Sequence, residues 1–226
     1  MKVVILAAGR GSRFGSKDHP KALTTLTIGK SIMEYQLEQI QRHISLDHVM
    51  IVVGYHKEDI MNAFPDVLYV YNPLFAEENT AKSLLRALSK CEEDVLWING
   101  DVVFHPSVLE KILKTPRTSM VVNEGSVGEE EVKYRKDDNG KILVVSKTVD
   151  DPQGEALGIN YCSASDLSHL RRGLEQCADM DYFERGIEFC IEEGMAVWSI
   201  PVDQSHCTEI DFPEDLVRAN KMLLTW

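Results

Sequence analysis

The stretch Leu6–Leu23 reads LAAGRGSRFGSKDHPKAL and is the most informative part of this 226-residue chain. It follows directly on Val3–Leu6, a continuous apolar run of the kind found in strands that are buried on both faces. Its three glycines and its small alanine and serine residues let backbone N–H groups approach an anion closely. We therefore predict a buried strand that leads into an anion-binding loop.

This loop concentrates positive charge in an acidic protein. The formal net charge of the chain is −12, whereas Arg10, Arg13, Lys17 and Lys21 all lie within the loop. So much negative charge repels the backbones of nucleic acids and anionic membrane surfaces, so we expect neither as a partner. A nucleotide, in contrast, needs local cations such as these around its phosphates.

Two better-known phosphate-binding motifs do not fit the loop. The dinucleotide motif G-x-G-x-x-G, counted from Gly9 and Gly11, has Phe14 where its third glycine should stand. The P-loop motif G-x-x-x-x-G-K-[ST] does not occur in the sequence. A flexible basic loop that binds no ligand is the alternative that these residues leave open.

Apolar runs and helical periodicities alternate along the first half of the chain. This order predicts an α/β fold, with a Rossmann-like mixed, mostly parallel sheet flanked by helices. The expected strands are 3–6, 49–53, 67–71 and 95–98, and the expected helices are 31–44, 58–64, 80–88 and 106–113.

The second half changes character, with antiparallel strands joined by a tight turn at Asp138-Asn139-Gly140. The expected strands are 119–123, 131–135, 141–146, 156–162 and 196–200, and the expected helices are 167–176, 182–192 and 213–224. Because no repeat or long linker interrupts the sequence, we expect a single domain over 1–226. Its nucleotide-binding half covers about 1–115 and its acceptor-binding half about 116–226.

The composition excludes some classes of protein. No run of about 18 apolar residues occurs, so we expect no membrane-spanning helix. The five cysteines are scattered and form no CxxC pair, which favours a reduced, cytoplasmic protein.

An aspartate follows the strand expected at 95–98. Asp101 would lie at the carboxyl edge of the sheet, where open α/β sheets bind their ligands. Magnesium prefers oxygen ligands and commonly combines one or two carboxylates with substrate phosphates. Asp101 is thus a candidate metal ligand, although Gly100-Asp101 is equally compatible with an ordinary turn.

The first loop closely resembles the signature of the nucleotidyltransferases with a GT-A-like fold, L-A-A-G-x-G-x-R followed by P-K. This group includes sugar-1-phosphate nucleotidyltransferases, choline-phosphate cytidylyltransferases and relatives that act on phosphonates or inositol phosphate. The resemblance implies catalytic roles for Arg13, on the β- and γ-phosphates, and for Lys21, at the α-phosphate or the acceptor phosphate. It implies nucleotide contacts from Leu6, Ala7, Ala8, Gly9, Arg10, Gly11, Ser12, Asn79, Ser83 and Gly100.

The same resemblance implies a second metal ligand near the end of the chain. Asp211, in Glu209-Ile210-Asp211, matches the family's second carboxylate, so Mg²⁺ is the expected cofactor, held by Asp101 and Asp211. Glu209 is expected to support the site. The alternative is that Asp211 caps the helix that starts at Pro213.

Asn79 and Ser83 are four residues apart and are expected on one helical face, where the resemblance places them at the base. A helix cap is the alternative reading of this pair. The short spacer Ser16–His19 is similar to that of molybdopterin guanylyltransferases, which leaves the choice of base open.

The second half resembles the acceptor half of cytidylyltransferases for small phosphates and phosphonates. The resemblance implies that Lys133 and Lys147 bind the acceptor phosphate and that Glu155 also contacts the acceptor. Tyr182, in the cluster Asp181–Glu184, corresponds to residues that cage a quaternary ammonium in the choline-phosphate enzymes. Solvated lysines and a core aromatic are the alternatives.

The expected function is Mg²⁺-dependent transfer of CMP from CTP to a small phosphorylated or phosphonylated metabolite, with release of pyrophosphate. The alternatives are a guanylyl- or uridylyltransferase of the same fold and a non-catalytic nucleotide-binding subunit. A monomer or a homodimer is expected.

Overall fold

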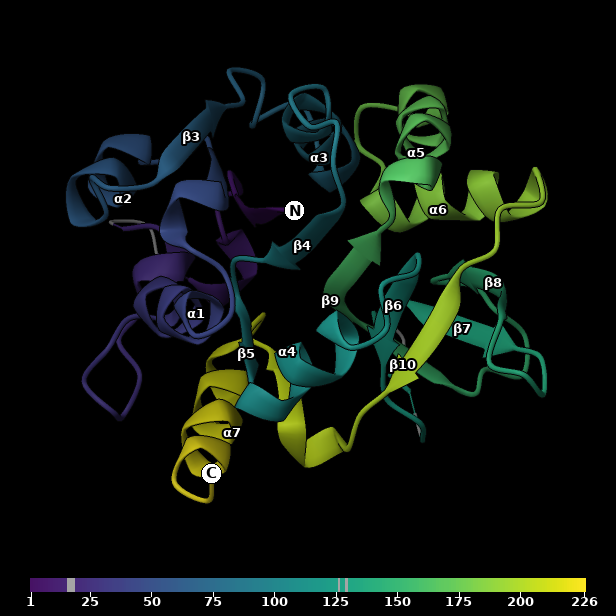
Figure 1. Cartoon of the computed structure of the whole chain (residues 1–226). Coiled ribbons are helices and arrows are strands. Elements are labelled where there is room, and N and C mark those ends of the chain that lie inside the picture. Colours follow the sequence, from purple (N-terminus) through teal and green to yellow (C-terminus); the bar gives the residue numbers. More distant parts are fainter. Residues whose placement is uncertain (16–18, 126, 129) are drawn as a thin grey trace.

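The computed structural model describes residues 1–15, 19–125, 127–128 and 130–226 (Figure 1). Lys17 and the side chain of Ser12, which belong to the predicted phosphate loop, lie outside the described part. Within that part, no helix combines the length and the apolar character needed to cross a membrane.

A nine-stranded sheet runs through both halves of the chain, in the order β10-β6-β9-β4-β1-β2-β3, with β7 and β8 attached beside β9. Strand β1 pairs in parallel with β2 and β4, and β2 pairs in parallel with β3. Strand β9 is antiparallel to both of its neighbours. The predicted mixed, mostly parallel sheet is therefore confirmed. The strands are β1 (Lys2–Ala7), β2 (Val49–Val53), β3 (Leu68–Tyr71), β4 (Val95–Asn99), β6 (Ser119–Val122), β7 (Lys133–Lys136), β8 (Ile142–Ser146), β9 (Gly154–Cys162) and β10 (Trp198–Pro201).

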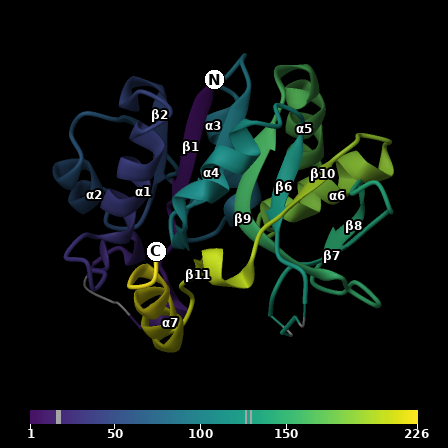
Figure 2. The same ribbon diagram turned by 60° about the horizontal axis from the view of Figure 1, so that its bottom comes forward.

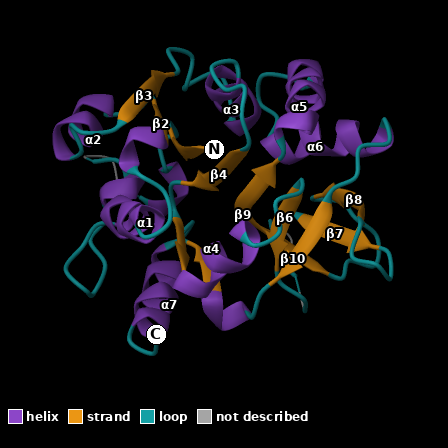
Figure 3. Ribbon diagram, in the orientation of Figure 1, coloured by secondary structure: helices purple, strands orange, loops and turns teal. Residues whose placement is uncertain are grey.

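Helices cover both faces of the sheet, as Figure 3 shows. They are α1 (Ile32–Gln41), α2 (Lys57–Ala63), α3 (Thr80–Leu88), α4 (Pro106–Leu113), α5 (Ala164–Gln176), α6 (Phe183–Glu192) and α7 (Pro213–Leu223). Alternate residues of β1 enter different cores, because neighbouring side chains of a strand point to opposite faces. Val3 and Ile5 pack with residues of α1 and α4, whereas Val4 and Leu6 pack with residues of α3, α5 and α6.

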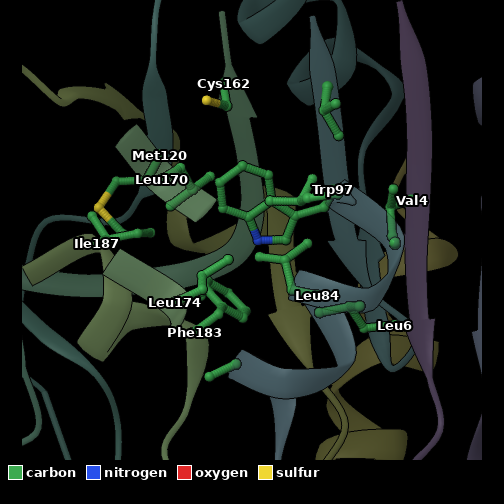
Figure 4. Packing of buried hydrophobic residues seen from close by; sticks show 14 of the residues in the cluster. Val4, Leu6, Leu84, Trp97, Met120, Cys162, Leu170, Leu174, Phe183 and Ile187 are labelled. Carbon is green, nitrogen blue, oxygen red and sulfur yellow. The ribbon is translucent and has the colours of Figure 1, made fainter. Parts of the chain in front are cut away.

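Trp97 lies at the centre of the second of these cores (Figure 4). Its ring meets Phe183 edge to face, with centroids 5.7 Å apart. Trp97 belongs to β4 and Phe183 begins α6. Their contact therefore joins the two halves of the chain on the face of the sheet that packs against α3, α5 and α6.

A small second sheet, absent from the sequence-based expectation, pairs β5 (Val102–Phe104) with β11 (Cys207–Glu209) antiparallel. Each strand has three residues, which is too short for an alternating pattern to be recognised in the sequence. The pairing continues past β11, where the Ile210 N–H donates to the Asp101 carbonyl at 3.0 Å. This pairing places the acidic segment 209–211 and α7 at the same end of the molecule as the carboxyl end of β1 (Figure 2).

Several expected boundaries are wrong by a few residues. The helix expected at 31–44 spans Ile32–Gln41, because Ser31 is its cap and accepts a hydrogen bond from Glu34 N at 3.1 Å. The strand expected at 131–135 lies at Lys133–Lys136, where pairing with β8 fixes its register.

Candidate active site

A cleft of about 620 Å³ opens at the carboxyl ends of β1 and β4. Its lining comes from the first loop, the start of α3, the turn after β4, β9, and the starts of α6 and α7. The predicted site residues that line it are Leu6, Ala7, Gly9, Arg10, Gly11, Arg13, Lys21, Asn79, Gly100, Asp101, Lys147, Glu155, Tyr182 and Asp211. One cleft thus gathers residues from nearly the whole length of the chain.

The turn after β4 is pressed against the start of the phosphate loop. Gly100 N donates to the Leu6 carbonyl at 2.9 Å, and a Cβ on Gly100 would lie only 2.8 Å from that oxygen. From α1, the fully buried Gln36 donates to the carbonyls of Asn99 at 2.9 Å and Val102 at 2.7 Å. The turn that bears Asp101 is therefore held from both sides, and glycine is required where it meets β1.

Lys21 lies between the two predicted metal carboxylates. Its ammonium is 3.0 Å from Asp211 Oδ1 and also forms an ion pair with Asp101. Arg13 Nη2 contacts Asp211 Oδ2 at 3.2 Å, so both predicted catalytic cations meet the same carboxylate. Burial alone would lower the pKa of the Lys21 ammonium, but the charges of Asp101 and Asp211 outweigh it and raise that pKa.

Asp101 and Asp211 provide the oxygen ligands that suit a magnesium ion. Oδ1 of Asp101 is buried and has no hydrogen-bond partner among the described residues. Over the same residues, no cluster of three or more His, Cys, Asp or Glu side chains is arranged around a metal position. A magnesium ion held by these two carboxylates would thus take its other ligands from substrate and water, which is its usual coordination.

The alternative role for Asp211, as the cap of the last helix, is wrong. Asp215 caps the start of this helix instead, because its Oδ2 accepts hydrogen bonds from the backbone N–H groups of Asp211 at 3.0 Å and Phe212 at 2.8 Å. Arg218 in turn holds Asp215 Oδ1 at 3.0 Å. Neither Asp215 nor Arg218 was predicted from the sequence to support the site. Their i, i+3 spacing on the last helix was a usable signal, because it makes the two side chains neighbours on the helix surface.

Glu209 lines the cleft together with Asp101 and Asp211, the two predicted metal ligands. Its Oε1 accepts from Asn99 Nδ2 at 3.1 Å. Burial, and then the negative charges of Asp101 and Asp211, raise the pKa of Glu209 well above its usual range.

Two acids from the second half of the chain also line the cleft, with Glu184 buried and Glu155 half-buried. Glu155 Oε1 accepts from Asn123 Nδ2 at 2.6 Å, and burial followed by the neighbouring Glu131 raises the pKa of Glu155 to about 7. Glu184 is 7% exposed, and burial raises its pKa to about 7 as well. These groups convert readily between a neutral acid and a carboxylate near neutral pH.

The predicted acceptor lysines have different positions. Lys147 lines the cleft, with its ammonium 3.5 Å from Glu130 and 4.6 Å from the centre of the Tyr182 ring. Lys133 does not line the cleft, and its ammonium donates to the Lys147 carbonyl at 3.0 Å. Lys133 is therefore placed to support the segment that carries Lys147.

Asn79 is the cap of α3, as the alternative reading of this pair predicted. Its Oδ1 accepts from Thr80 N at 2.8 Å, while the residue still lines the cleft. Ser83 lines a hollow of about 60 Å³, together with Ala8 and Gly9, and this hollow shares most of its lining with the cleft. The predicted base-binding residues thus lie around one recess.

The two ends of the cleft are joined by hydrogen bonds. Asn79 N donates to the Asp179 carbonyl at 2.7 Å, and Phe183 N donates to Thr80 Oγ1 at 3.0 Å. The start of α3, at the small recess, is therefore fixed to the start of α6, which carries Tyr182 and Glu184.

Comparison with known proteins identifies the family of this chain. A family model described as the MobA-like NTP transferase domain matches residues 3–176. The chain belongs to this family. The assignment confirms the resemblance to nucleotidyltransferases that the first loop suggested.

Two relatives show how far the similarity extends. The CMP-5′-(3-aminopropyl)phosphonate synthase of Streptomyces rubellomurinus is 34% identical over 129 residues, which are 54% of this chain and 20% of that protein. The bifunctional protein GlmU of Methanococcus maripaludis is 31% identical over 172 residues, which are 73% of this chain and 39% of that protein. The match thus spans less than half the length of either relative.

Solved structures share the fold over almost the whole chain. The CTP:phosphocholine cytidylyltransferase of Streptococcus pneumoniae aligns with a TM-score of 0.82 at 20% identity, covering 98% of both chains. The inositol-1-phosphate CTP transferase of T. maritima aligns with a TM-score of 0.81 at 19% identity, covering 98% of this chain and 95% of that one. At these identities, the likeness establishes the nucleotidyltransferase fold.

Proposed function

We propose that this protein transfers CMP from CTP to a small acceptor that carries both a phosphonate or phosphate group and an amine, with release of pyrophosphate. The observation that carries the proposal is the position of Lys21 between Asp101 and Asp211, next to a glycine-rich loop. A half-buried cation and two carboxylates beside such a loop support the binding of a triphosphate with its metal. Mg²⁺ is the proposed cofactor and a reducing cytoplasm the proposed location.

The reaction is an in-line displacement at the α-phosphorus. An acceptor oxygen forms the new bond to this phosphorus, while the bond to the bridging oxygen of pyrophosphate breaks. The acceptor oxygen is already ionised at neutral pH, so the protein needs no general base. Asp101 and Asp211 would hold the Mg²⁺, which when bound would supply positive charge to the phosphate oxygens.

The residues of the chain position the reactants and stabilise charge, which provides most of the catalysis in phosphoryl transfer. The Lys21 side chain is only 14% exposed, so its ammonium suits a role in stabilising charge that shifts during the reaction. Arg13, 43% exposed, is further into solvent and suits the β- and γ-phosphates of the leaving group. The backbone N–H groups of the loop complete the cradle.

The amine of the acceptor is inferred from the acids at the far end of the cleft. Glu184 is a buried and Glu155 a half-buried carboxyl group, and the pKa of each is raised to about 7, so an approaching ammonium would readily convert them to carboxylates. The face of Tyr182 is already close to the Lys147 ammonium. This favours an amine bound by carboxylates over one caged by this ring. The name of the Streptomyces relative, an aminopropylphosphonate synthase, agrees with such an acceptor.

Pyrophosphate release tests the proposal, measured with the four ribonucleoside triphosphates and matched acceptors. We expect the highest kcat/KM with CTP and 2-aminoethylphosphonate. Ethylphosphonate, which lacks the amine, should be about ten- to a hundredfold poorer, since it leaves a buried charged partner unsatisfied. Equal rates for the two acceptors would contradict the amine site.

A uridylyltransferase acting on a sugar phosphate is the second candidate. The relative GlmU matches 73% of this chain, more than the 54% matched by the phosphonate enzyme, and its name specifies no phosphonate acceptor. Higher kcat/KM with UTP and a sugar 1-phosphate than with CTP and any amino-phosphonate would establish this second candidate instead.

A further inference from the structure

A buried hydrogen-bond network lies behind the small recess at the start of α3. Asn72 is fully buried, and its Oδ1 accepts from Arg86 Nε at 3.1 Å and from Leu74 N at 2.9 Å. Its Nδ2 donates to Ser83 Oγ at 3.0 Å. Arg86 is itself held by Glu78, with Nη2 at 2.8 Å from the carboxylate. The network thus runs from Glu78 through Arg86 and Asn72 to Ser83.

Chemistry fixes the direction of these hydrogen bonds. An arginine nitrogen and a backbone N–H can only donate, so the Asn72 atom that faces Arg86 and Leu74 must be the oxygen. The other amide atom is then the nitrogen, which donates and does not accept. Ser83 Oγ therefore accepts from Asn72, and the Ser83 hydroxyl keeps its own hydrogen for another partner.

Ser83 lies at the wall of the recess, where this hydrogen matters. The residue is 5% exposed and lines the hollow of about 60 Å³ together with Glu78. This volume admits the edge of a ring, while the rest of the ring extends into the main cleft. The wall of the recess thus offers a hydroxyl donor from Ser83 and a carboxylate acceptor from Glu78.

We propose that Asn72, held by Arg86, orients the Ser83 hydroxyl as a donor and so makes the recess select cytosine over uracil. This inference rests on the proposed function, because the recess must receive the base of the nucleotide. Cytosine presents an amino donor beside the N3 acceptor, whereas uracil presents a carbonyl acceptor beside an N3–H donor. With the Ser83 hydroxyl facing N3 and the Glu78 carboxylate facing the exocyclic group, the pair matches the first edge and mismatches the second at both positions.

Asn72→Asp reverses the polarity while keeping the shape of the side chain. A carboxylate accepts where the amide nitrogen donated, so the Ser83 hydroxyl turns its hydrogen towards it and offers a lone pair to the base. We expect the ratio of the CTP affinity to the UTP affinity, measured by calorimetry without acceptor, to fall about ten- to a hundredfold. Ser83→Ala removes the donor without burying a new charge and should also lower this ratio.

A double-mutant cycle separates this mechanism from a general disturbance of the site. If Asn72 acts through the Ser83 hydroxyl, Asn72→Asp will lower the ratio in the wild type and leave it unchanged in the Ser83→Ala background. The inference is overturned if Ser83→Ala leaves the ratio unchanged, if Asn72→Asp does so, or if Asn72→Asp lowers the ratio equally in both backgrounds. Wild-type protein that binds neither nucleotide would contradict the proposed function itself, and a nucleotide-binding protein with unchanged ratios would contradict this assignment alone.

Discussion

Lys21 and Arg13 contact the same carboxylate but differ in their surroundings. Lys21 bridges Asp101 and Asp211 with 14% of its side chain exposed, whereas Arg13 is 43% exposed. A cation in the enclosed region stabilises charge that shifts during the reaction, while a cation at the edge binds the triphosphate in both the ground state and the transition state. The two residues should therefore affect different kinetic constants.

We predict that Lys21→Ala lowers kcat by about a hundred- to a thousandfold with a small effect on CTP binding. Arg13→Ala should mainly raise the KM for CTP. Lys21→Arg should restore activity only in part, because a planar fork replaces a compact charge. Steady-state kinetics of the variants side by side check this, and the opposite pattern would show that the two roles are reversed.

Glu184 gives a prediction for stability against pH. Its pKa is raised from 4.5 to about 7 in the folded protein, mainly by burial. Between these values the folded state binds more protons than the unfolded state, so stability falls as pH rises from about 4.5 to about 7. The shift corresponds to roughly 3 kcal/mol for this group.

Glu184→Gln should remove this contribution and make the free energy of unfolding less dependent on pH over that range. Urea unfolding of wild type and variant at intervals from pH 5 to pH 8 is the measurement. A variant with the same pH dependence as the wild type would show that the buried carboxyl does not titrate as described.

The residues of the first loop that line the cleft could be picked out from the sequence, because their spacing is local. Sequence analysis missed Arg218 and Asp215, and it placed Lys133 in the cleft. The roles of these three residues depend on which face of a helix or strand meets the cleft. Strand alternation alone did not specify which side of its strand faces the cleft at Lys133.

At the scale of elements, the site depends on the pairing of β5 with β11. This pairing and the cap of α7 together fix Asp211, since Asp215 accepts two backbone N–H groups at the turn that carries it. The small sheet could not be predicted from three-residue strands. The central strands could, because their apolar runs are continuous and buried on both faces.

We predict that Asp215→Ala raises the Mg²⁺ concentration needed for half-maximal activity by about ten- to a hundredfold, the usual cost of losing a group that orients a metal ligand. Glu214→Ala, one residue earlier and exposed, is the matched control and should leave the requirement unchanged. A magnesium titration of both variants decides the point. The same Mg²⁺ requirement in Asp215→Ala and wild type would exclude this role for the cap.

At the scale of the whole molecule, one sheet and one core connect the first half of the chain with the second. Trp97 on β4 and Phe183 at the start of α6 meet inside this core. We propose that the chain folds as a single unit for this reason.

Trp97→Ala should cost about 3–5 kcal/mol of stability, as is typical when a large aromatic is removed from a core. Urea unfolding followed by circular dichroism and by tryptophan fluorescence should give one coincident transition in the wild type. Separate transitions for the two probes would contradict folding as a single unit.

We propose that this cleft joins CMP to an amino-phosphonate, and ³¹P NMR follows that reaction through the signals of its phosphorus atoms. A mixture of the protein, Mg²⁺, CTP and 2-aminoethylphosphonate should lose the CTP signals and gain those of pyrophosphate and a mixed phosphonate–phosphate anhydride. Asp101→Ala and Asp211→Ala should form neither product while remaining folded. Unchanged CTP in the wild-type sample, or pyrophosphate formed with free CMP and no anhydride, would contradict the proposed transfer of CMP to an amino-phosphonate.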